Sequence, residues 1–104
     1  MIKVSIFYPN GPDVHFDEAY YRDHHMPMVK NRLGEHCKHY AIDKAIPDAS
    51  GKLTAPYIAM GHLYCESVEA FQTGFGLHAE EIMADISNYT NQTPIIQFSE
   101  VLVR

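Results

Sequence analysis

The order of the extended and helical segments constrains this chain more than any other feature. Residues 2–8 alternate between two faces, as in a half-buried strand. Two helical patterns follow, one at 16–33 and one that begins after Ser67, a good N-cap residue. The extended segments are residues 2–8, 36–46, 57–65 and 94–103. The chain therefore runs β-α-β-β-α-β.

This order predicts a split βαβ, ferredoxin-like α+β fold, in which an antiparallel four-stranded sheet carries both helices on one face. A length of 104 residues allows one domain, residues 1–104. We expect the uncovered face of the sheet to carry large apolar side chains: Phe7, Met60, Tyr64 and Phe98. Because an exposed apolar face of that size marks a partner surface, we expect a homodimer whose sheets enclose a shared cavity, a dimeric α+β barrel.

The apolar stripe of the first helical segment recurs every four residues: Phe16, Tyr20, His24 and Met28. Gly34 is expected to end this helix, and Pro27 to kink it, because proline cannot donate to the carbonyl of Asp23. On an ideal helical wheel His24 falls within the apolar arc and His25 at its edge. A change of phase at Pro27 would reverse the two.

The charge pattern excludes several classes of partner. Eight Lys and Arg stand against 13 Asp and Glu, a net charge of −5, and no basic run occurs. We therefore expect neither nucleic acid nor an anionic membrane as a partner. The sequence contains no apolar run of the ~20 residues that a membrane span needs. Two cysteines do not make a disulfide framework, so we expect a cytoplasmic protein.

Residues 16–29 resemble the first-helix signature of the EthD family, which is named for ethyl tert-butyl ether degradation. The signature combines a Phe, an aromatic pair and a His-x-Pro motif, which fall here on Phe16, on Tyr20 with Tyr21, and on His25 with Pro27. The resemblance continues in Tyr8-Pro9, in 67–71 and in 85–90 ahead of Pro94. It covers nearly the whole chain.

This resemblance implies a dimeric α+β barrel of ferredoxin-like subunits that acts on, or binds, a compact organic molecule. Proteins of the wider superfamily include haem-degrading monooxygenases, quinol-forming monooxygenases and muconolactone isomerase. The resemblance also selects His25 as the site residue of the first helix.

His25 is the candidate catalytic residue, and His24 is the fallback. A histidine that faces an apolar cavity can act as a general acid or base, since its ordinary pKa of ~6.5 lies near neutral pH. Alternatively, the imidazole would cap carbonyl groups that Pro27 leaves free. His78 lies on the apolar stripe of the second helical region. It either approaches the cavity or is a structural histidine, and we favour the structural role.

Several aromatic side chains are candidate walls of a substrate pocket: Phe7, Tyr20, Tyr21, Tyr64 and Phe98. A phenol hydroxyl there would orient a carbonyl or hydroxyl group of the ligand. With His24 and His78 they form the predicted substrate-binding set. Aromatic stripes at this spacing are also typical of an ordinary core, so only some of them are expected to touch a ligand.

The sequence predicts no metal site and no cofactor. His24 and His25 are neighbours on a helix and cannot chelate from one face. Cys37 and His39 share a strand face, but no third ligand accompanies them. Gly-rich phosphate loops and zinc-hydrolase motifs do not occur.

Other polar residues of the expected elements leave alternatives open. Asp85, Asn88 and Tyr89 end the second helical region. They contribute either to the rim of the barrel or to a helix cap and turn, and we favour the cap. The pattern leaves the strand faces of three polar residues undecided: Ser5, His62 and Glu100.

Two functions compete. The first is a cofactor-independent oxidoreductase or isomerase of small-molecule catabolism, with an apolar or aromatic compound in the barrel cavity and His25 as general acid or base. The alternative is a non-catalytic carrier that delivers a hydrophobic compound to a monooxygenase system. A purely structural dimerisation module is a third possibility, and it would have its cavity packed shut.

Overall fold

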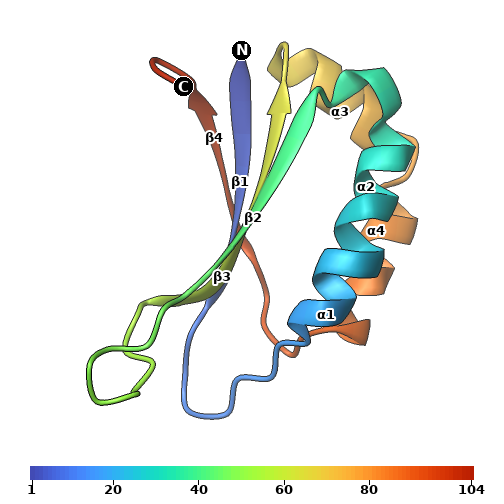
Figure 1. Cartoon of the computed structure of the whole chain (residues 1–104). Helices are drawn as coiled ribbons and strands as arrows, with labels where there is room; N and C mark the ends of the chain where they lie inside the picture. The colour runs from blue at the N-terminus through green and yellow to red at the C-terminus, as the bar shows by residue number, and fades with distance from the viewer.

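A computed structural model describes the chain from residue 1 to residue 104. Four strands form one antiparallel sheet in the order β2-β3-β1-β4. Their bounds are β1 Ile2–Pro9, β2 His39–Lys44, β3 Tyr57–Cys65 and β4 Ile95–Glu100. All helices lie on the same face of this sheet (Figure 1). The predicted ferredoxin-like α+β fold is therefore confirmed, with β2 and β4 shorter than expected.

Two helical regions cover the sheet, and both are interrupted. The first comprises α1 (Glu18–Tyr20), a π-helical turn at Tyr21–His25, α2 (Met26–Leu33) and a 3-10 turn at Gly34–His36. The second comprises α3 (Val68–Gly76), α4 (Ala79–Asp85) and a 3-10 turn at Ile86–Asn88. None of these helices combines the length and the apolar character that a bilayer crossing requires.

The π-helical turn decides which histidine faces the core. The N–H of Met26 donates to the carbonyl of Tyr21, five residues back, and the next residue is Pro27, which has no N–H to continue an ordinary helix. The extra residue in this turn rotates the helix. His25 is thereby 4% exposed, whereas His24 lies on the surface. The change of phase that the proline made possible has taken place.

Strand register assigns the two faces of the sheet. Val4 and Tyr8 of β1 are buried beneath the helices, and Phe98 pairs with Val4 across β4. Phe98 therefore points toward the helices, where its ring meets that of Phe71 at 5.6 Å. This corrects the expectation that Phe98 lies on the uncovered face. The register also places Glu100, opposite Ile2, on the helix side at the exposed end of β4.

The uncovered face of the sheet carries Phe7 and Tyr64, as expected, together with a row of polar contacts. Ser5 pairs with His62 across β1 and β3, and its hydroxyl lies 2.9 Å from Nδ1 of that histidine. Nε2 of His62 lies 3.2 Å from a carboxylate oxygen of Asp43 on β2. This face is therefore mixed in character rather than uniformly apolar.

Candidate functional site

A cavity of about 410 Å³ lies between the sheet and the helices of a single chain. Fourteen of its 17 lining residues are hydrophobic. They come from β1, β3, β4, the π-helical turn, α2, α3, α4 and the 3-10 turn after α4. The sequence patterns predicted a cavity shared between two sheets, whereas the observed cavity is lined by residues of one subunit. His25 lies on the helix side of the sheet, so its side chain faces this internal cavity and not the space between two sheets.

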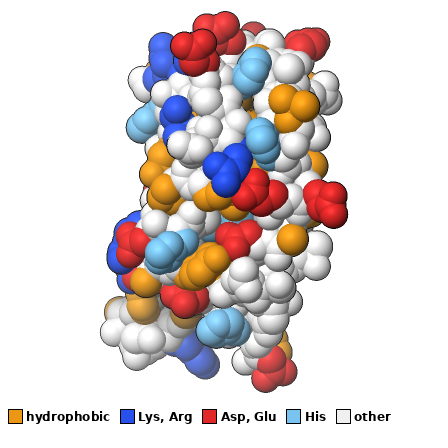
Figure 2. Space-filling model, turned by 90° about the vertical axis from the view of Figure 1, so that its right-hand side faces the viewer, with side chains coloured by type: hydrophobic (Ala, Val, Ile, Leu, Met, Phe, Trp, Pro, Cys, Tyr) orange, Lys and Arg blue, Asp and Glu red, His pale blue; other side chains and the backbone are white.

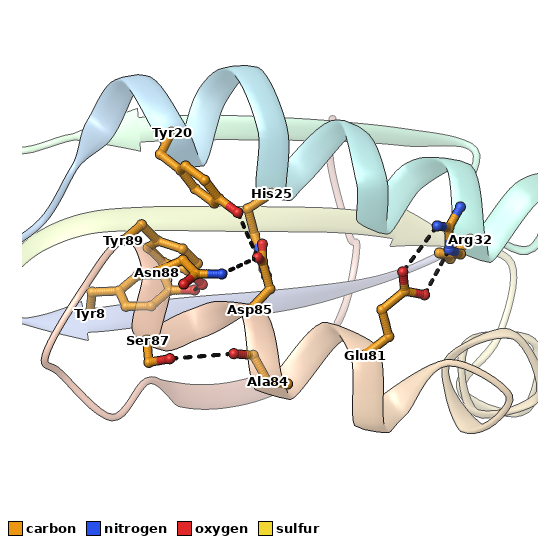
Figure 3. Close-up of polar contacts among 10 residues, drawn as sticks. All are labelled: Tyr8, Tyr20, His25, Arg32, Glu81, Ala84, Asp85, Ser87, Asn88 and Tyr89. Atoms are coloured by element: carbon orange, nitrogen blue, oxygen red, sulfur yellow. Dashed lines mark hydrogen bonds and ion pairs between the residues drawn. The ribbon is translucent and has the colours of Figure 1, made fainter.

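His25 lines the closed end of this cavity and is held by Asp85. Its Nδ1 lies 2.8 Å from Oδ2 of Asp85, which stands at the end of α4 (Figure 3). Because an ionised carboxylate only accepts hydrogen bonds, Nδ1 carries the proton and donates it. Nε2 then keeps its lone pair and makes no hydrogen bond to the protein. The imidazole is thus set up to accept a proton through Nε2.

Three donors converge on the Asp85 carboxylate. Besides His25, the hydroxyl of Tyr20 donates to Oδ1 at 2.6 Å, and the side-chain amide of Asn88 donates to the same oxygen at 2.9 Å (Figure 3). Partial burial raises the pKa of Asp85, but these hydrogen bonds outweigh it and bring the pKa below its ordinary value. Asp85 is therefore ionised at neutral pH.

Burial has the opposite effect on the histidine. Desolvation lowers the pKa of His25, and the hydrogen bond and charge of Asp85 offset only part of that effect. The pKa of His25 consequently lies below its ordinary value, so the imidazole is neutral at pH 7. A neutral imidazole oriented by a carboxylate is the form that a general base requires.

Aromatic rings hold the imidazole in place. Tyr21 stacks on His25 with ring centroids 5.6 Å apart, and the ring of Tyr89 lies 4.6 Å away on a tilted plane. The Tyr8 and Tyr89 hydroxyls share a hydrogen bond of 2.7 Å. Burial raises the pKa of all three tyrosines. All three therefore stay neutral, and two of them, Tyr21 and Tyr89, contact the imidazole of His25.

The predicted site residues divide among four places. His25, Tyr21 and Phe98 line the cavity. Tyr20 and His24 line a separate groove on the outer side of the helices, with Glu81 and Asp85. Figure 2 shows that acidic and histidine side chains lie among one another on this outer face.

The other three predicted residues lie away from the cavity. Phe7 and Tyr64 are on the uncovered face of the sheet, where each packs on an aromatic neighbour. His78 is the residue before α4 and lines a shallow surface pocket. The structure therefore places His25, Tyr21 and Phe98 on the cavity and links Tyr20 to His25 through Asp85. The other four residues lie outside this cluster: His24, Phe7, Tyr64 and His78.

The sequence patterns did not assign Asp85 to the site, because it was interpreted as a helix cap. Its spacing offered a signal: Asp85 follows Ile82 by three residues and precedes Tyr89 by four, and both of these are buried. A carboxylate on the inner face of a helix must find partners. Two of its three partners, Tyr20 and His25, come from the first helical region, and no local pattern could identify them.

No three His, Cys, Asp or Glu side chains lie close enough together to hold a metal ion. The Cys37 and His39 pair considered from the sequence is not arranged for chelation. The Cys37 thiol instead lies 3.3 Å from the backbone carbonyl of His39.

A family model and two solved structures relate this chain to the EthD family. The EthD domain model matches residues 12–93. An EthD-like protein from Ralstonia eutropha JMP134 is 44% identical, with a TM-score of 0.91 over 99% of this chain and 93% of that one. An ethyl tert-butyl ether degradation (EthD) family protein from Bacillus halodurans C-125 is 14% identical, with a TM-score of 0.65 over 98% and 99%.

A dimeric ferredoxin-like protein from an uncultured marine organism is 11% identical, with a TM-score of 0.64 over 100% of this chain and 97% of that one. At this level of identity the similarity concerns the fold. No curated protein matches the chain.

Proposed function

The chain belongs to the EthD family, and on that premise we propose that it is an enzyme of small-molecule catabolism in which His25 is the general base. The substrate is a compact apolar or aromatic compound held in the internal cavity. The observation that carries this proposal is the His25–Asp85 pair, which leaves a free Nε2 at the wall of an apolar cavity.

The chemistry that this geometry supports is proton transfer at carbon. Nε2 takes a proton from a carbon next to a carbonyl group, and the electron pair moves onto the carbonyl oxygen. When a C=C bond adjoins the deprotonated carbon, the imidazolium, stabilised by Asp85, returns the proton to the far carbon of that bond. The C=C bond moves into conjugation with the carbonyl group, which completes an isomerisation. The same deprotonation also begins an oxidation without a cofactor, in which dioxygen takes the electrons of the resulting carbanion, so isomerase and oxidoreductase share this first step.

The size and lining of the cavity support a small ring compound as the substrate. Pockets for small molecules span roughly 300–1,000 Å³, and a cavity of about 410 Å³ is at the small end of that range. Its walls are mainly aliphatic and aromatic, which favours apolar rings over sugars, phosphates or charged metabolites.

The uncovered face of the sheet supports a homodimer. Phe7, Met60 and Tyr64 are only partly buried there, and the face belongs to a fold that is dimeric in the marine relative. In the proposed dimer the two sheets face each other and the two cavities remain separate, one beneath each helical layer.

The isomerisation of cyclohex-3-enone tests the proposed base. Proton transfer from C2 to C4 gives cyclohex-2-enone, whose conjugated carbonyl is followed by ultraviolet absorbance. We expect His25→Gln to lower kcat/KM by about 10²- to 10⁴-fold, with the circular dichroism spectrum unchanged. His15→Gln is the matched control, since the side chain of His15 is exposed and the residue is held through its backbone.

The carrier function makes the opposite prediction for the same experiment. A carrier would bind the ketone in the cavity, and the wild type would convert it no faster than His25→Gln does. Equal rates for the two proteins would therefore contradict the proposed base and favour carriage.

A further inference from the structure

The cavity has a closed end and a mouth. At the closed end its lining residues are buried, among them His25, Tyr21 and Met26. On the side of β4 and α4 the lining residues are exposed, and Met83, Ile96 and Phe98 are 51%, 48% and 45% exposed. A ligand that enters between β4 and the second helical region therefore meets His25 last.

Only two of the side chains that line the cavity have a polar group that makes no hydrogen bond and is accessible from solvent or from the cavity. One is His25, through Nε2, at the closed end. The other is Gln72 of α3, an exposed residue whose amide forms no hydrogen bond within the protein. The hydroxyl of Tyr21 is also unpaired, but it is enclosed by protein atoms.

The position of Gln72 contrasts with that of its neighbours. Phe71 and Phe75 lie on the same helix and line the same cavity with aromatic rings. When the cavity is empty, water can satisfy the hydrogen-bonding groups of the exposed Gln72 amide, so leaving it without a protein partner costs little free energy. It gains a partner only when the occupant brings a hydroxyl or carbonyl oxygen to the mouth.

We propose that Gln72 is a specificity-determining residue that binds an oxygen function of the substrate at the mouth of the cavity. The proposal rests on the proposed function and narrows its substrate class. The substrate is a compact ring compound that carries oxygen at the end opposite the carbon or hydroxyl that reaches His25. The amide both donates and accepts, so it suits a hydroxyl or a carbonyl group.

Two ligands that differ by one hydroxyl test this assignment. 2-Naphthol offers one hydroxyl, which His25 can accept, and 2,6-dihydroxynaphthalene offers a second at the far end of the same ring system. Dissociation constants are measured by naphthol fluorescence, and proton–carbon NMR of His25 and Met26 reports whether the ligand occupies the cavity.

In the wild type we expect the diol to bind about five- to tenfold more tightly than 2-naphthol, the increment of one hydrogen bond. Gln72→Leu should remove this preference and leave the affinity for 2-naphthol within about twofold. Thr73→Leu, a change at the next, exposed position of α3 that does not line the cavity, is the matched control and should keep the preference.

Two results would overturn the proposal in different ways. If Gln72→Leu keeps the wild-type preference for the diol, the amide does not bind the second oxygen, and the role of His25 is untouched. If neither naphthol shifts the His25 and Met26 signals of the wild type, the cavity takes no ring compound. In that case the proposed function fails together with this inference.

Discussion

The hydroxyl of Tyr21 occupies the space in which a side chain at position 61 would begin. A Cβ built on Gly61 of β3 would overlap this hydroxyl, and it would also lie 3.2 Å from the terminal methyl of Met26. The glycine therefore lets the Tyr21 ring reach the sheet, and that ring in turn stacks on His25. A position without a side chain thus supports the orientation of the candidate base.

Gly61→Ala is expected to destabilise the protein by about 1–3 kcal/mol, the usual cost of overpacking a core. Tyr21→Phe alone should cost little, since the hydroxyl has no hydrogen-bond partner to lose. The double variant should recover part of the loss, because the phenyl ring lacks the overlapping oxygen. Urea unfolding of the four proteins measures this coupling, and equal losses in the single and double variants would contradict it.

The pH dependence of turnover should follow the lowered pKa of His25. The base form is the neutral imidazole, so kcat/KM should rise with pH through an apparent pKa below ~6.5 and level off near neutrality. Asp85→Asn removes the partner that raises this pKa, so the rise should move to still lower pH while the plateau falls by about 10-fold. A profile that Asp85→Asn leaves unchanged would show that the carboxylate does not act on His25.

The free energy of unfolding, like kcat/KM, should increase as the pH rises toward neutrality. In the unfolded chain His25 binds a proton as the pH drops below ~6.5, whereas the folded protein keeps it neutral down to its lowered pKa. The unfolded state therefore holds more protons in that window, and the free energy of unfolding should fall with acidification. His25→Gln should remove this part of the pH dependence in urea unfolding between about pH 5 and 7.

The proposed dimer should depend on the uncovered face of the sheet. Phe7→Glu places a charge among Tyr57 and His62, the aromatic neighbours of Phe7 on that face, and should give a folded monomer. Ile46→Glu, at a position that is 84% exposed in the loop after β2, should leave the assembly unchanged. Light scattering after size exclusion measures the mass of both variants; a dimeric Phe7→Glu protein would place the interface elsewhere.

Local patterns were sufficient for most of the fold. Alternation along residues 2–8 predicted a half-buried strand, and the residues of its buried face include Val4 and Tyr8. Gly34 was expected to end the first helical region, and Ser67 was expected to begin the second. Such features depend on neighbours within a few residues, so a sequence contains the information for them. The face of Phe98 was predicted incorrectly, because alternation leaves open which face of an edge strand the helices cover.

The chain's sequence by itself determined the order of its elements, its family and the presence of a histidine next to Pro27. Tertiary structure alone decided that the π-helical turn points His25 inward, that Asp85 arrives from 60 residues away to hold it, and that the cavity lies beneath the helices of one subunit. The physical reason is the range of the interactions. Secondary structure follows from local hydrogen bonds and periodicity, whereas a hydrogen-bonded His–Asp pair and a cavity exist only where distant segments pack together.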